Sequence, residues 1–282
     1  MSVVWLAERD DGEVRQRVAL KLPHAGPGQA LLAARLRRER QLMASLAHPH
    51  IARLLDVGVT PQGLPYMALE YIDGQPLHTH CHDLHLGLHE RLQLFLQVLG
   101  AVQHAHQQLV LHRDLKPGNI LVDTQGQVKL LDFGIAKLIR GTDGPGASGT
   151  APSTELTQHS GQVLTPDYAA PEQIAGLPLT TASDVYALGV ILFELLTGQR
   201  PYKLPRGTRG ALEEAILAAE VRRPSQVWRE AEASTLHLDA VTPTELAAHF
   251  HSTPARLAQR LQGDLDVIVA QRSEEHTAEL QS

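Results

Sequence analysis

The stretch VLHRDLKPGNILV, residues 110–122, has apolar, β-prone ends and a charged centre. The centre holds Arg113, Asp114, Lys116 and Asn119, and burying unpaired groups of this kind is strongly unfavourable. A packed core would exclude these side chains unless a bound partner compensates for them. Hydrophobic residues make up 43% of the 282-residue chain and charged residues 20%, so a folded core around this stretch is expected.

Composition excludes several classes of protein. A net charge of −6 argues against a nucleic-acid partner held by bulk charge. The single cysteine, Cys81, cannot form an intrachain disulfide, which favours a reducing, cytoplasmic location. The longest apolar run, VYALGVILFELL at 185–196, falls short of the roughly 20 residues that span a bilayer. We therefore expect a buried helix there and no membrane segment in this sequence, while an anchor elsewhere in a longer parent protein stays open.

Hydrophobic periodicity predicts a small sheet-rich region followed by a mainly helical one. In the first region we expect strands over 2–9 and 13–22 around a turn at 10–12, a helix over 28–46, and a hairpin turning at 60–63. Residues 73–76 are expected to link the regions. In the second region we expect a helix over 88–109, a hairpin turning at 124–126, a loop over 140–162, and helices near 181–197, 210–220 and 254–271.

The charged residues suit phosphoryl transfer from a nucleotide, which needs positive charge near phosphate oxygens and hard oxygen ligands for a metal ion. A hydroxyl nucleophile also needs a carboxylate to accept its proton. Asp114 can be that carboxylate, and Lys116 can steady the transferred phosphate. Asn119 and Asp132 can hold Mg²⁺. The expected partner of the charged centre is therefore a metal-bound polyphosphate together with a substrate hydroxyl.

Four motifs in order, VALK (18–21), HRDLKPGN (112–119), DFG (132–134) and APE (170–172), give the chain a resemblance to the protein kinase family. The DLKPGN and LTPDYAAPE segments resemble serine/threonine-specific members, and the chain looks most like bacterial eukaryotic-like (Hanks-type) kinases. The resemblance implies an α+β, two-lobed fold. Residues 1–72 would form a small β-rich N-lobe with one helix, and residues 73–271 a larger, mainly helical C-lobe.

The resemblance also implies roles for individual residues. Asp114 would be the catalytic base, acting with Lys116 and Asn119, and Asn119 and Asp132 would bind Mg²⁺, with Mn²⁺ as an alternative. Lys21 would pair with Glu39 and position the ATP phosphates. Val4, Ala19 and Leu121 would enclose the adenine, Leu69 would be the gatekeeper, and Glu70 and Ile72 would offer backbone hydrogen bonds to the base. Asp184 would support the catalytic loop.

The implied substrates are serine and threonine hydroxyls of proteins, with self-phosphorylation in the 140–162 loop. A pseudokinase-like binding or scaffold module, or an inactive fragment, stays open as the alternative. A kinase of small molecules is disfavoured by LTPDYAAPE, which resembles a peptide-docking segment. The histidine-rich segment at 78–89 is interpreted as an ordinary helix and loop, with a metal site as its alternative.

The ends depart from the family pattern. The glycine-rich loop is incomplete, with Val4 at its last position and Ser2 in place of its third glycine. Compared with the family pattern, we expect the last C-lobe helix to be missing, together with the arginine that would pair with Glu172. Residues 272–282 resemble the translation of a sequencing adapter and are expected to be non-native. We expect this chain, as written, to be poorly stable and weakly active.

Overall fold

The structure, a computed structural model, describes residues 2–10, 12, 15–23, 46–133, 166–202, 222–233 and 243–270. The chain divides into two compact units. The first combines Met1–Gln75, Gly100–Asp114 and Asn119–Val163, and the second combines Pro76–Leu99, Leu115–Gly118 and Leu164–Ser282. Glu39, the helix predicted near 210–220, the 140–162 loop and the 272–282 tail lie outside the described residues, as does the helix predicted over 28–46 except for Leu46. The lobe boundary after residue 72 stays a prediction.

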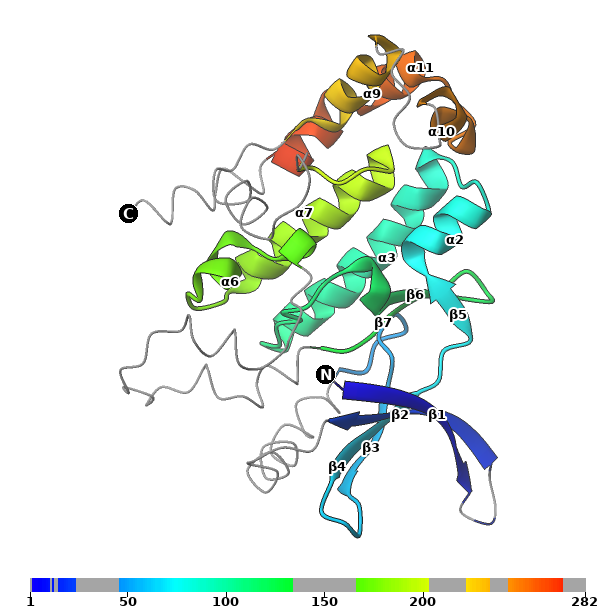
Figure 1. Ribbon diagram of the computed structural model, residues 1–282, viewed down its shortest axis with the longest axis vertical. Helices are drawn as coiled ribbons and strands as arrows, with labels where there is room; N and C mark the ends of the chain where they lie inside the picture. Colours follow the sequence, from blue (N-terminus) through cyan, green and yellow to red (C-terminus); the bar gives the residue numbers. More distant parts are fainter. Residues whose placement is uncertain are drawn as a thin grey trace. The chain divides into compact units, whose positions relative to one another are not determined.

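A four-stranded antiparallel sheet forms the core of the first unit (Figure 1), in the order β1-β2-β4-β3. Its strands are β1 (Ser2–Asp10), β2 (Arg15–Pro23), β3 (Leu54–Val59) and β4 (Pro65–Glu70). Both predicted hairpins are confirmed. In the first turn, Gly12 N donates to Asp10 Oδ1 at 3.0 Å, and Gly12 has a φ of +88°, which glycine adopts without the steric cost of a Cβ.

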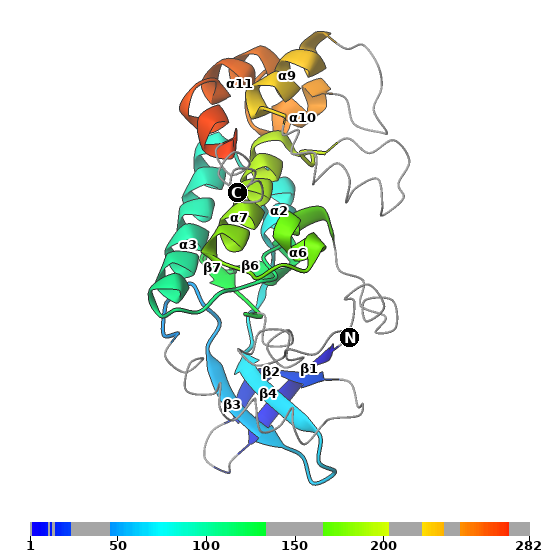
Figure 2. The same cartoon turned by 90° about the vertical axis from the view of Figure 1, so that its left-hand side faces the viewer.

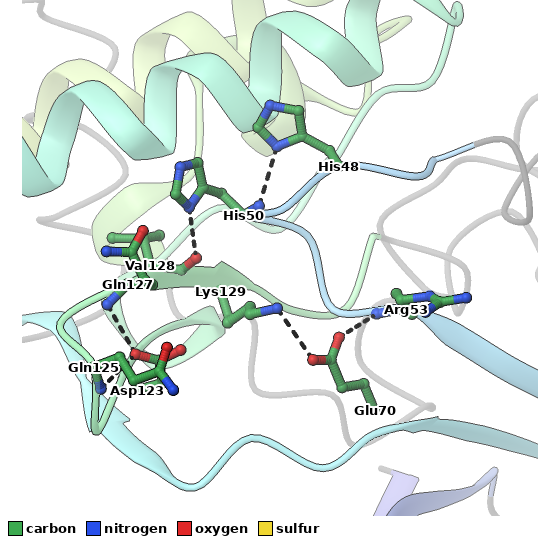
Figure 3. Close-up of polar contacts among 9 residues, drawn as sticks. All are labelled: His48, His50, Arg53, Glu70, Asp123, Gln125, Gln127, Val128 and Lys129. Atoms are coloured by element: carbon green, nitrogen blue, oxygen red, sulfur yellow. Dashed lines mark hydrogen bonds and ion pairs between the residues drawn. The ribbon is translucent and has the colours of Figure 1, made fainter.

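A smaller sheet has the order β5-β6-β7 and consists of β5 (Gly74–Pro76), β6 (Ile120–Asp123) and β7 (Val128–Leu130). Its predicted turn at 124–126 is confirmed, because Asp123 Oδ1 accepts hydrogen bonds from Gln125 N at 2.9 Å and Gln127 N at 2.8 Å (Figure 3). The boundary between the two units falls inside the segment 73–76 that is expected to link the regions, and residues 74–76 of it also form β5. Glycine permits this close pairing, since a Cβ at Gly74 would lie 2.3 Å from the Val122 carbonyl oxygen.

The helices are α2 (Leu77–Asp83), α3 (Leu88–Gln107), α6 (Pro171–Ala175), α7 (Thr181–Thr197), α9 (Pro224–Ala233), α10 (Pro243–His249) and α11 (Pro254–Leu261), with 3₁₀ turns η1 (Pro117–Asn119) and η2 (Pro166–Tyr168). The helix predicted over 88–109 ends at Gln107, and the helix predicted near 181–197 has those bounds. The single helix predicted over 254–271 is wrong. Gln262 is extended and Gly263 has a φ of +103°, so the helix breaks there and resumes over residues 264–270.

Helix α7 is the buried helix that the apolar run at 185–196 predicts. Thr180 caps its first turn by accepting a hydrogen bond from Ala182 N, and Gly198 ends it in the left-handed conformation, as glycine commonly does at a helix C-terminus. Val190, Phe193 and Leu196 on this helix are fully buried. No helix in the described parts of the chain is both long enough and apolar enough to cross a membrane.

The C-terminal helices pack on the end of α7 within the second unit. Figures 1 and 2 both show α9 beside α11. Trp228 of α9 is buried and donates from Nε1 to the Leu196 carbonyl oxygen at 3.1 Å. Buried Asp266 accepts hydrogen bonds from Ser225 N at 2.9 Å and Ser225 Oγ at 2.5 Å. A carboxylate at the start of α9 is favoured by the partial positive charge of a helix N-terminus.

Candidate active site

An ion pair joins Lys21 and Asp132 in the first unit. Lys21 Nζ lies 2.8 Å from Asp132 Oδ1, and the two side chains are 11% and 27% exposed. Asp132 has a φ of +52°, a conformation that is unfavourable for a residue with a side chain and is often found at functional sites. Charged groups this far removed from water require a partner. The structure thus brings together two residues to which the sequence gives roles around one ligand.

One face of the larger sheet carries four of the predicted nucleotide-binding residues. Val4 pairs with Lys21 across β1 and β2, and Ala19 pairs with Leu69 across β2 and β4. Cross-strand partners project to the same face, as do residues two apart in a strand. Val4, Ala19, Lys21 and Leu69 therefore share a face. Leu69 is buried, whereas Val4 is 55% exposed.

The segment around Asp114 is held by hydrogen bonds of the Asn119 and His112 side chains. Asn119 Nδ2 donates to the Asp114 carbonyl oxygen at 2.7 Å and to Asp114 Oδ2 at 3.1 Å. His112 Nδ1 accepts from Asp114 N at 3.3 Å, while its Nε2 lies 2.8 Å from the Leu131 carbonyl oxygen. This pattern requires the neutral His112 tautomer with hydrogen on Nε2. His112 thereby ties the residue before Asp132 to the Asp114 segment.

His112 is a site residue to which the sequence analysis assigns no role. It is fully buried, and its ring centroid lies 4.8 Å from that of Phe133. The only sequence signal is its place at the start of HRDLKPGN. Arg113 next to it has a φ of +66°, so the backbone is strained on both sides of the Leu131 contact, at Arg113 and at Asp132.

Glu70 meets two other segments through its main chain and its side chain (Figure 3). Its backbone N–H donates to the Arg53 carbonyl oxygen at 2.8 Å, and its Oε2 accepts from Arg53 N at 3.1 Å. Its Oε1 accepts from Lys129 Nζ at 3.1 Å. Because the amide hydrogen is already used, Glu70 has only its carbonyl oxygen to offer a base. Ile72 lies in the irregular segment that follows β4.

Leu121 lies on the smaller sheet, where it pairs with Lys129 across β6 and β7. Partners in such a pair project to one face, and from that face Lys129 reaches Glu70. Leu121 is therefore on the side of the sheet that meets the end of β4. Ile120, Val122, Val128 and Leu130 project to the opposite face and are buried.

Three predicted functional residues belong to the second unit and are described within it. Lys116 is half-buried and directly precedes Pro117, the first residue of η1. Asp184 is buried in the first turn of α7. Glu172 is also buried and accepts a hydrogen bond from Ser183 Oγ. Ser183, a helix residue that the sequence analysis does not single out, is thus one partner of Glu172, and the expected loss of the family's arginine partner stays a prediction.

The oxygen donors of the site fit a hard cation such as Mg²⁺. Asn119 uses its amide nitrogen toward Asp114, which leaves the amide oxygen as its ligand atom, and Asp132 offers a carboxylate. Both are oxygen ligands of the kind that Mg²⁺ prefers. The ion pair with Lys21 balances the Asp132 charge within the first unit. The predicted metal ligands thus have suitable chemistry.

The side chains of the histidine-rich segment pack in other ways than as a cluster of metal ligands. Burial raises the pKa of the Cys81 thiol to about 11, and a thiol ligand has to lose its proton. His82 and His85 instead pack against His249 of α10, with ring centroids 5.0 and 4.2 Å away. In the described parts of the chain, no group of three or more His, Cys, Asp or Glu residues is arranged to hold a metal ion.

Comparisons with known proteins identify the family of this chain. Residues 2–248 match the protein kinase domain family. The chain is 38% identical over 207 residues to serine/threonine-protein kinase PrkC of Bacillus subtilis, covering 72% of this chain and 29% of PrkC. It is 36% identical over 237 residues to serine/threonine-protein kinase pkn3 of Myxococcus xanthus, covering 74% of this chain and 42% of pkn3. The chain thus spans less than half the length of these curated relatives.

Solved structures show the same relationship. A crystal structure of the Mycobacterium tuberculosis PknI kinase domain aligns with a TM-score of 0.53 at 26% identity. The alignment covers 92% of this chain and 88% of that one. The predicted α+β kinase-like fold is confirmed by this match, and the predicted family by the match over residues 2–248. The chain belongs to the protein kinase domain family.

Proposed function

We propose that this protein is a serine/threonine protein kinase that transfers the γ-phosphate of ATP to hydroxyl groups of protein substrates. One observation carries the proposal: the Lys21–Asp132 ion pair and the Asp114–Asn119 hydrogen bonds occur together in the first unit. The names of relatives such as PrkC and pkn3 support serine and threonine as acceptors.

The proposed roles follow from the groups that each residue offers. Asp114 accepts the proton of the substrate hydroxyl and directs its oxygen. Asn119 orients the Asp114 carboxylate and, together with Asp132, supplies oxygen ligands to the metal ion. Lys21 moves its charge from Asp132 toward the phosphates, Glu39 pairs with Lys21, and Lys116 steadies the transferred group. Bound Mg²⁺·ATP supplies the phosphoryl group and offsets its charge.

The adenine site is proposed on the same basis. Val4 and Ala19 form one apolar wall, and Leu121 forms the opposite wall, as a flat aromatic base requires. Leu69 closes the end of the site as gatekeeper, and the Glu70 carbonyl and the Ile72 backbone bond the base. Mg²⁺ is the proposed metal, with Mn²⁺ as its substitute. Self-phosphorylation in the 140–162 loop and a cytoplasmic site of action are further parts of this proposal.

Transfer of labelled phosphate from ATP to a generic protein substrate tests the activity, with Asp114→Asn as the matched control. We expect transfer to serine and threonine that requires a divalent cation and is lost in the control. Phosphopeptide mapping of the protein itself tests the 140–162 loop. Nucleotide binding without any transfer would contradict the proposal and would favour a pseudokinase-like module.

A further inference from the structure

The carboxylate of Glu70 connects β4 to β7. Lys129 Nζ lies 3.1 Å from Glu70 Oε1, and the two side chains are only 17% and 28% exposed. The second carboxylate oxygen is bound by Arg53 N. A half-buried, doubly bonded carboxylate of this kind is better defined in position than a solvent-exposed ion pair. Figure 3 shows Lys129 and Arg53 approaching Glu70 from different segments.

Strand β7 is itself firmly held in the first unit. Leu130 N donates to the His50 carbonyl oxygen at 2.8 Å, and Ala52 N donates to the Leu130 carbonyl oxygen at 3.0 Å. His50 Nδ1 lies 3.1 Å from the Val128 carbonyl oxygen. The backbone on both sides of Lys129 is thus fixed by the segment that leads to Arg53. The backbone of Lys129 is therefore held in place, and its side chain can restrain Glu70.

Lys129 is also near two other residues with predicted roles toward the nucleotide, Leu121 and Asp132. It pairs with Leu121 across the smaller sheet and precedes Asp132 by three residues. Removing its charge would leave the Glu70 carboxylate with its hydrogen bond from Arg53 N, and Glu70 could then rotate away from its present position. The Glu70 main chain is held by its N–H bond to the Arg53 carbonyl oxygen, and the side-chain ion pair adds a second restraint on the residue whose carbonyl oxygen would meet the base.

We propose that Lys129 is a positioning residue for nucleotide binding: through its ion pair with Glu70 it holds the segment after β4 in the conformation that receives an adenine base. This inference rests on the proposed function for the identity of the ligand. The restraint on the backbone around Glu70 is a property of the protein alone. Lys129 touches no reacting group, so its loss weakens nucleotide binding and leaves the chemical step unchanged.

The first test measures the protein without nucleotide. In Lys129→Met, amide hydrogen exchange over residues 70–73 is expected to accelerate by about five-fold, as fits the loss of one half-buried ion pair. Lys129→Arg keeps the charge and is expected to restore slow exchange. Arg15→Met removes the ion-pair partner of Glu8 and Asp10 at an exposed site, and it is expected to leave this exchange unchanged.

The second test measures binding of a fluorescent ADP analogue and the kinetics of transfer. Lys129→Met is expected to raise the dissociation constant and the KM for ATP by about five-fold with kcat within two-fold. Glu70→Gln and the double variant complete a mutant cycle, in which the two effects are expected to be non-additive. Unchanged exchange and affinity, or a rise in kcat, would overturn the inference. If the unaltered protein transfers no phosphate, the proposed function is overturned. The hydrogen-exchange measurement on Lys129→Met would still decide whether Lys129 restrains the segment after β4.

Discussion

Lys21 Nζ and Asp132 Oδ1 are 2.8 Å apart, although the two residues are distant in the chain. The lysine comes from β2, and the aspartate comes two residues after the end of β7. Each side chain compensates for the burial of the other. The pair therefore has a structural role in the absence of ligand in addition to its proposed role toward phosphate.

Lys21→Met should reduce both stability and activity. We expect the free energy of unfolding to fall by about 1–3 kcal/mol, less than for a fully buried pair because Asp132 is partly exposed. Urea denaturation measures this change. The double variant with Asp132→Asn removes the unpaired charge and should recover part of the loss, and equal stability of the single and double variants would contradict the pairing. Transfer should fall by about a hundred-fold or more in both.

Asn119 combines two proposed roles, because its amide nitrogen donates to Asp114 and its amide oxygen is offered to the metal ion. Two substitutions of Asn119 separate these roles. Asn119→Ala removes both, and kcat should fall by about a hundred-fold. Asn119→Asp keeps an oxygen ligand, loses the donor and adds a negative charge beside Asp114. If orientation of Asp114 matters, Asn119→Asp should be as slow as Asn119→Ala at every Mg²⁺ concentration. Near-normal kcat in Asn119→Asp would show that ligation alone matters.

Ser183→Ala should destabilise the second unit through Glu172. The hydroxyl that bonds the buried Glu172 carboxylate is removed, and the loss of a hydrogen bond to a buried charged group costs about 1–3 kcal/mol. Thr181→Ala, at an exposed position in the same turn of α7, is the matched control and should change stability much less. Chemical denaturation compares the two, and equal effects would contradict the role of Ser183.

Stability should decrease with acidification through the histidines of the second unit. Burial, followed by the positive charges of His85, His82 and Arg91, lowers the pKa of His249 below its ordinary value of 6.5, although Glu245 opposes the shift. Burial also lowers the pKa of His80, against an opposing effect of Asp83. The unfolded chain therefore binds protons more readily than the folded one, so stability is full above pH 6.5 and falls from there toward the folded-state pKa.

Denaturation at several pH values between about 7.5 and 5 measures this loss. His249→Phe keeps an aromatic ring against His85 but cannot take a proton, so its stability should depend less on pH in this window. Burial and the nearby His104 and His50 also lower the pKa of His48 in the first unit, so some pH dependence should persist in the variant. An unchanged slope would mean that His249 does not contribute.

Local sequence patterns were sufficient to predict the hairpins at 10–12, 60–63 and 124–126 and the boundaries of α7. Turn residues and capping residues act over a few positions, so their effect is visible in the sequence. The break at Gln262 and Gly263 was missed because helical periodicity continues across it, and a single glycine inside such a pattern does not by itself end a helix. The strand β5 was missed because its partner β6 is distant in the chain.

By itself the sequence determined the family and the kinds of side chain in the candidate site. Motifs such as HRDLKPGN and VALK are contiguous in the sequence, and an ordinary apolar core would exclude their polar side chains. Tertiary structure alone decided which of these side chains meet. Lys21 with Asp132, Glu70 with Lys129 and Glu172 with Ser183 are contacts between separate segments of the chain, and the register of paired strands and packed helices selects them. No local propensity encodes that register, since it depends on the burial of the whole unit.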